Sequence, residues 1–138
     1  MLECLIIGDS IGVGVSQFRR ECPAYVQSGI SSPGWIKKYG EKTQPTKVLI
    51  ISLGANDYGI NTLPNIEKIR ANAKADKVFW LLPRLDRVPN AYDAVKKVAA
   101  TYGDTVLDRP KDISPDGIHP TAKGYRELAD KTRRLEQN

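Results

Sequence analysis

Apolar runs and helical patterns alternate along the whole chain. The apolar runs predict strands at residues 2–8, 24–28, 47–53, 77–82 and 104–107. Their apolar positions are nearly continuous, as expected for parallel strands that are covered on both faces. After each run, apolar residues recur at the three- and four-residue spacing of a helix that packs one face on a core. The pattern therefore predicts a repeated succession of strand and helix.

Two of the predicted helices carry clear boundary signals. Asn61 and Thr62 precede the third helix, and Pro64 falls in its first turn. Asn90 is the expected N-cap of the fourth helix, and Gly103 its terminator. Strands that alternate with helices in this way predict a doubly wound α/β fold, a three-layer α/β/α sandwich around a parallel five-stranded sheet. Ligands of such folds bind at the carboxyl ends of the strands.

The composition fits one compact globular domain over residues 1–138. The chain is 41% hydrophobic and has a mean hydropathy of −0.39. No apolar run approaches the roughly 20 residues of a membrane span. The first residues lack the basic start of a signal peptide, so a cytoplasmic location is the default expectation. Export by another route and association with a virion are the alternatives.

Charge and metal-binding residue types exclude further classes. The net charge is +5, but it is spread as +1 over residues 1–60 and +4 over residues 61–138, and no basic stripe with interleaved aromatics predicts nucleic-acid binding. His119 is the single histidine, which excludes a zinc site built on several histidines. Cys4 and Cys22 match neither a disulfide framework nor a metal site. We expect Cys4 to be a buried core thiol, assign no role to Cys22 and expect no cofactor.

The first strand ends in Gly8-Asp9-Ser10, directly before a helix. Unpaired backbone N–H groups and the helix dipole lower the cost of negative charge there, which suits a serine nucleophile. Two other interpretations stay open. Ser10 could serve only as the N-cap of the helix. Gly8, Gly12 and Gly14 could form a loose phosphate-binding turn, although they lack the spacing of a dinucleotide fingerprint and no Walker lysine follows.

Polar residues also follow the third strand and precede the last helix. Asn56 comes after the strand expected beside the first one, so its amide can face Ser10 and donate to a developing oxyanion. Asp116 lies three residues before His119, which lets the carboxylate accept from one imidazole nitrogen while the other faces away. A turn-forming Asn and a structural His are the plain alternatives. Taken together, the four residues predict nucleophilic catalysis at one edge of the sheet.

On these residues the chain resembles the SGNH (GDSL-type) hydrolase family. The family's blocks match Gly8-Asp9-Ser10, Gly54-x-Asn56-Asp57 and Asp116-x-x-His119, in the family's order and from residue 2 to about residue 135. The resemblance implies a flavodoxin-like sheet in the order 2-1-3-4-5, metal-free ester hydrolysis and a triad of Ser10, His119 and Asp116. It also implies an oxyanion hole made by the Ser10 N–H, a backbone N–H of a second block and the Asn56 side chain.

The second block departs from the family pattern. In the stretch after the second strand, Gly29 matches by residue type, whereas Ser32 matches better by its distance from the strand. Either N–H can serve as the donor, but Pro33 is excluded because it has no N–H. The first block reads Gly-Asp-Ser-Ile-Gly and not the commonest Gly-Asp-Ser-Leu-Ser, which leaves the nucleophile intact.

The predicted function is metal-independent hydrolysis of an ester by a serine nucleophile. A chain of 138 residues leaves little sequence for a lid or an acyl tunnel. This favours a short acyl group, such as acetyl, on a bulky alcohol such as a glycan. Arg84 and Arg87, after the fourth strand, are either solvated loop charges or contacts to an anionic glycan. Asp9 and Asp57 are expected to brace turns and not to react.

Other functions stay open. Within the family, the resemblance allows thioesterases, lysophospholipases and arylesterases. From a different class, a non-catalytic glycan-binding or structural module is the main alternative, and a flavin or nucleotide binder on the same fold is a third. The expected partner is a small-molecule or glycan ester, and the oligomeric state is not predicted. Compact domains of this kind also resemble forms found in phage genomes.

Overall fold

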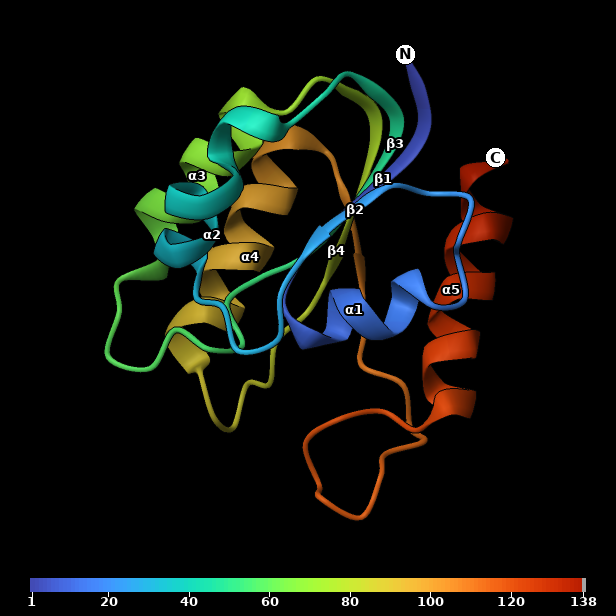
Figure 1. Cartoon of the computed structure of the whole chain (residues 1–138). Helices are drawn as coiled ribbons and strands as arrows, with labels where there is room; N and C mark the ends of the chain where they lie inside the picture. The colour runs from blue at the N-terminus through green and yellow to red at the C-terminus, as the bar shows by residue number, and fades with distance from the viewer. Residues whose placement is uncertain (138) are drawn as a thin grey trace.

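A parallel five-stranded sheet forms the centre of the computed structural model, which describes residues 1–137 (Figure 1). The strands are β1 (Leu2–Gly8), β2 (Ala24–Val26), β3 (Thr46–Ser52), β4 (Ala75–Leu81) and β5 (Thr105–Leu107). Their order is β2-β1-β3-β4-β5, and every neighbouring pair is parallel. Both features agree with the prediction from sequence.

Helices cover both faces of the sheet. They are α1 (Ser10–Ser16), α2 (Ser32–Tyr39), α3 (Thr62–Asn72), α4 (Pro89–Tyr102) and α5 (Ala122–Glu136), with a 3-10 turn, η1 (Gly40–Lys42), after α2. Helices α2, α3 and α4 pack on one face, and α1 and α5 pack on the other (Figure 1). Leu5 and Ile7 of β1 face the first group and Ile6 faces the second, and all three are fully buried. Burial of each contributes about 1.5–3 kcal/mol. The three-layer prediction is therefore confirmed. Within residues 1–137, no helix has the length and apolarity to cross a membrane.

The start of α4 differs from the prediction. The helix begins at Pro89 with Val88 as its N-cap, and Asn90 is already helical. Proline suits the first helical position because its φ fits the helix and its missing N–H would have no partner there. Asn90 instead donates its side-chain amide to the carbonyl of Ile60. At the other end, Gly103 terminates the helix in the left-handed conformation, with a φ of 71°, as predicted.

Cys4 and Cys22 form a disulfide, so the expectation of a free core thiol at Cys4 is wrong. The register of the sheet explains the pairing. Ile6 lies opposite Ala24 in the β1–β2 pair. Cys4 lies two residues before Ile6, and Cys22 lies two residues before Ala24. Strand pairing therefore brings the two side chains together across a sequence separation of 18.

Candidate active site

The residues predicted for catalysis come from three connections at the carboxyl edge of the sheet. Ser10 follows β1, Asn56 follows β3, and the loop with Asp116 and His119 follows β5. Because β1 lies beside β3 and all strands run in one direction, these connections meet at the same edge. This is the edge at which doubly wound folds bind ligands.

Hydrogen bonds link a hydroxyl, an imidazole and a carboxylate in that order. Ser10 Oγ lies 3.1 Å from Nε2 of His119, and Nδ1 of the same ring lies 2.8 Å from Oδ2 of Asp116. In this arrangement an imidazole can take a proton from the hydroxyl while the carboxylate orients the ring. Ser10 is half-buried, whereas the side chains of His119 and Asp116 are 42% and 47% exposed. The site is therefore open and shallow.

The loop that carries Asp116 and His119 is held by its own hydrogen bonds. Oδ1 of Asp116 accepts from the N–H groups of Ile118 and His119, at 2.8 and 2.9 Å, and from the Ser114 hydroxyl at 2.7 Å. The hydrogen bond from the His119 side chain, followed by these bonds, keeps the pKa of Asp116 below its usual range. Gly117 has a φ of 71°, which glycine adopts without strain. The carboxylate is thus held ionised and aimed at the ring.

Two arginines hold the same loop from outside. Arg84, in the β4–α4 connection, donates to the carbonyl of Gly117. Arg109, which follows β5, donates to the carbonyl of Ile118. From sequence, Arg84 is expected to be either a solvated charge or a glycan contact, and no pattern singles out Arg109 or Ser114. These contacts join segments that carry no shared motif, so sequence spacing gives no signal for them.

Asp9 fixes the turn that presents Ser10. Its N–H donates to the carbonyl of Ser52 at 2.9 Å, and its Oδ1 accepts from the Ser52 hydroxyl at 2.8 Å and from the N–H of Ile11 at 3.1 Å. The last bond makes Asp9 the N-cap of α1, so Ser10 is the first helical residue and not the cap. Asp9 therefore ties the end of β1 to the end of β3, in line with the bracing role expected for it.

The Asp9 carboxyl group is an unusual neighbour for Ser10. It is fully buried, and this burial raises its pKa to about 6, against the opposing effect of its hydrogen bonds. Its second oxygen, Oδ2, has no hydrogen-bond partner within the described residues. The carboxyl group therefore changes its charge near pH 6.

The glycines at the end of β1 and in α1 permit close packing. Gly12 and Gly14 lie inside α1. A Cβ at Gly14 would lie 2.2 Å from the ring of Tyr125, and a Cβ at Gly8 would lie 2.0 Å from the carbonyl oxygen of Ser52. Only glycine leaves room for these approaches.

The two candidates for the second backbone donor differ in availability. The Ser32 N–H donates to Oδ1 of Asp57 at 2.8 Å, and Ser32 is fully buried. Its N–H is therefore committed, and the assignment of Ser32 to an oxyanion hole is wrong. Gly29 lies in an exposed turn with a φ of 80°. Its N–H donates to no acceptor in the part of the chain that the structure describes, so Gly29 stays as the candidate.

Asn56 is anchored in a braced turn. Its Nδ2 donates to the carbonyl of Ile30 at 3.0 Å, which leaves the second amide N–H for another acceptor. The adjacent Asp57 accepts from the Thr62 hydroxyl at 2.9 Å and from the Ser32 hydroxyl. Asp57 thus joins the turn to the starts of α2 and α3, as a bracing residue should.

Comparison with solved structures identifies the fold. A protein from Bacteroides fragilis with an inferred acylhydrolase activity matches with a TM-score of 0.76 and 16% identity, over 98% of this chain and 86% of that one. A protein of the G-D-S-L family from Desulfitobacterium hafniense, inferred to be lipolytic, matches with a TM-score of 0.67 and 14% identity, over 98% and 99% of the two chains. The chain therefore has the fold of these proteins, as the resemblance in its sequence implies.

A third structure with this fold is the C-terminal catalytic domain of a peptidoglycan O-acetyltransferase from Streptococcus pneumoniae. It matches with a TM-score of 0.65 and 17% identity, over 99% of this chain and 93% of that one. No family model and no curated protein matches the sequence. The likeness is therefore one of fold.

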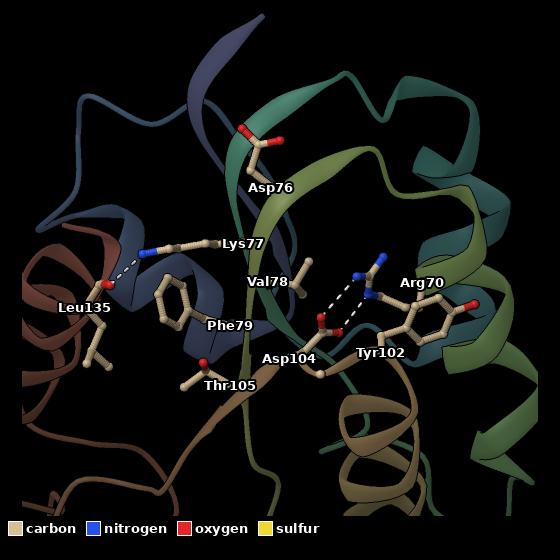
Figure 2. Close-up of a pocket in the computed structure, with 10 residues that line it drawn as sticks. Arg70, Asp76, Lys77, Val78, Phe79, Tyr102, Asp104, Thr105 and Leu135 are labelled. Atoms are coloured by element: carbon tan, nitrogen blue, oxygen red, sulfur yellow. Dashed lines mark hydrogen bonds and ion pairs between the residues drawn. The ribbon is translucent and has the colours of Figure 1, made fainter. Parts of the chain in front are cut away.

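Other parts of the described chain add no chemistry to this site. A cavity of about 370 Å³ lies at the opposite edge of the sheet, between the start of β4 and the ends of α4 and α5. Nε of Arg70 lies 2.7 Å from Oδ2 of Asp104, and Figure 2 shows this pair next to Tyr102. Its principal charges neutralise each other. Within residues 1–137, no group of three or more His, Cys, Asp or Glu side chains is placed to hold a metal ion.

Proposed function

We propose that the protein is a serine esterase, and the hydrogen-bonded series Ser10–His119–Asp116 is the observation that carries this proposal. Ser10 Oγ attacks the ester carbonyl while His119 takes its proton and then delivers it to the leaving alcohol. Asp116 keeps Nδ1 protonated and stabilises the imidazolium. Water then cleaves the acyl-enzyme, again with His119 as the base. Assistance of this kind contributes roughly 10²–10⁴-fold in rate.

The proposed oxyanion hole uses the Ser10 N–H, the Gly29 N–H and the Asn56 amide. Ser10 is the first residue of α1, where backbone N–H groups lack partners within the helix. The uncommitted N–H groups of Gly29 and Asn56 support the other two assignments. Loss of one such donor typically lowers turnover about 10²–10³-fold.

The proposed substrate is a short-chain acyl ester, with acetyl the preferred acyl group, on a carbohydrate. The exposure of His119 and Asp116 supports an open site that admits a bulky alcohol. A catalytic domain named for peptidoglycan O-acetylation shares the fold, which supports acetyl chemistry on a glycan without deciding the substrate of this chain.

Hydrolysis of p-nitrophenyl esters from acetyl to octanoyl, with EDTA present, tests this function in the wild-type protein and in Ser10→Ala. We expect the acetyl ester to be cleaved fastest and the variant to lose this activity. A maximum at longer chains would redirect the assignment to lipids or thioesters. Activity that is indifferent to Ser10, or absent, would favour the alternative of a glycan-binding module.

A further inference from the structure

A groove of about 440 Å³ lies between the turn after β3 and the β4–α4 connection, at the carboxyl edge of the sheet that also carries the candidate active site. Residues 57–61 form one wall and residues 87–90 form the other. Its volume falls within the roughly 300–1,000 Å³ of small-ligand sites. The first wall starts at Asp57, the residue directly after Asn56, so one turn carries both the groove wall and a candidate oxyanion donor.

Arg87 gives this groove a positive charge. Its side chain is exposed and makes no ion pair or hydrogen bond among the described residues. Arg84, three residues earlier, by contrast forms an ion pair with Asp86 and donates a hydrogen bond to the loop that carries His119. The carboxylate that lines the groove, Asp57, is buried and committed to hydrogen bonds within the protein. The charge of Arg87 is therefore uncompensated in the groove.

Two helix N-termini add to this potential. Helix α3 begins at Thr62 and α4 begins at Pro89, on opposite walls of the groove, and neither has a side-chain hydrogen bond at its N-cap. Uncapped N–H groups and the helix dipole favour negative charge nearby. They reinforce Arg87, which is the group suited to direct contact with an anion.

The other lining residues suit a sugar. Tyr58 is 56% exposed although it is a large aromatic residue, and its ring offers an apolar face for stacking. The side-chain amide of Asn61 can bind hydroxyl groups. The planar guanidinium of Arg87 matches a carboxylate with two parallel hydrogen bonds. A ring with hydroxyls and a carboxylate combines all three requirements.

We propose that this groove binds a carboxylate-bearing sugar unit of the substrate, with the carboxylate on Arg87 and the sugar ring on Tyr58. The proposal rests on the esterase function above and narrows its substrate to an acidic, O-acylated glycan. The acylated sugar occupies the site at Ser10, and the acidic unit of the same glycan chain occupies the groove.

The test compares kcat/KM for an O-acetylated oligogalacturonide with kcat/KM for a neutral O-acetylated manno-oligosaccharide. We expect kcat/KM of the wild-type protein to be about tenfold or more higher for the acidic glycan, because only that glycan can accept a charged hydrogen bond from Arg87. Added salt should reduce this preference. Arg87→Gln should abolish most of it, mainly through KM. The control variant Arg20→Gln removes a positive charge at an exposed position outside the groove, and it should keep the preference for the acidic glycan.

Equal kcat/KM for the two glycans in the wild-type protein overturns the proposal, and so does a preference that Arg87→Gln leaves intact. Failure of the wild-type protein on p-nitrophenyl acetate as well would instead remove the esterase function. Calorimetric titration with non-acetylated oligogalacturonide then tests the groove alone. Binding that Arg87→Gln weakens and Arg20→Gln preserves supports it, and no binding overturns it.

Discussion

Nε2 of His119 lies 3.1 Å from Oγ of Ser10, although 109 positions separate the two residues in the chain. Separate sets of hydrogen bonds hold the two halves of this contact. Asp9 fixes the turn before Ser10 through Ser52, and Asp116 fixes the loop before His119. Each half can therefore be altered while the bonds that hold the other half remain.

An amide at position 116 tests the orientation of the imidazole. In Asp116→Asn, the remaining oxygen can still accept from the backbone N–H groups of Ile118 and His119. The amide NH₂ would face Nδ1 and favour the tautomer with its proton on Nε2, toward Ser10. We expect kcat for p-nitrophenyl acetate to fall about 10²–10⁴-fold with little change in thermal stability. Asp130→Asn, which breaks a surface ion pair in α5, is the control, and an unchanged kcat in Asp116→Asn would refute the triad.

Removal of the Asn56 amide tests the oxyanion hole. Asn56→Ala should lower kcat about 10²–10³-fold and leave KM nearly unchanged, because the donor acts on charge that develops in the transition state. Asn65→Ala is a matched control, since Asn65 also donates from a side-chain amide to a backbone carbonyl but lies in α3. Steady-state kinetics of both variants decide the matter, and a rise in KM alone would show that Asn56 binds substrate and not the transition state.

The loop of His119 should depend on Arg84. Arg84→Ala removes the bond to the carbonyl of Gly117 and lets the loop shift. We expect kcat to fall roughly 10- to 100-fold, since a displacement of about 1 Å can cost 10² in rate. Arg84→Lys should rescue little, because an ammonium group cannot bridge Asp86 and Gly117 as the guanidinium does. Kinetics on p-nitrophenyl acetate measure the effect, with the exposed Arg134→Ala as control; wild-type kcat in Arg84→Ala would mean that the loop holds itself.

Local signals in the sequence predict most of the fold and the places of the candidate catalytic residues. Near-continuous apolar runs mark the parallel strands, and the polar residues at their ends mark the edge where Ser10, Asn56 and His119 lie. The predicted end of α4 at Gly103 is correct, because a left-handed glycine is enough to end a helix. The predicted start is wrong by a residue or two, because Pro89 takes the first helical position ahead of Asn90. Local propensity thus determines which elements form better than where they begin.

The remaining features depend on contacts between segments that carry no shared motif. The choice between Gly29 and Ser32 is decided by Asp57, 25 positions after Ser32. The hydrogen bond from Arg84 to the carbonyl of Gly117, in the loop of His119, joins residues that lie 33 positions apart. Such contacts follow from strand order and register, which spacing along the chain does not reveal. Resemblance to a family predicts the candidate triad but not these supporting contacts.

The buried Asp9 predicts a pH dependence of stability. Its pKa is raised to about 6 in the folded protein from the ordinary aspartate value of 3.8, so the folded state binds the proton more tightly than the unfolded state. The stability that this proton contributes is complete at low pH and is lost as the pH rises from about 4 to 6. Between pH 4.5 and 7.5, urea unfolding should show the wild-type protein losing on the order of 2 kcal/mol relative to Asp9→Asn. A pH-independent difference between the two proteins would contradict the raised pKa.

The disulfide predicts a loss of stability on reduction. A bridge between Cys4 and Cys22 closes a loop with a sequence separation of 18, for which restriction of the unfolded chain is worth about 3 kcal/mol. Urea unfolding with and without reductant should show this loss in the wild-type protein. The free energy of unfolding of the double variant Cys4→Ala/Cys22→Ala should be the same with and without reductant. Thiol titration of the unfolded, unreduced protein should detect no free thiol, and two thiols would contradict the bridge. Because such bridges persist in oxidising compartments, the same titration on protein from its natural source also tests the default expectation of a cytoplasmic location.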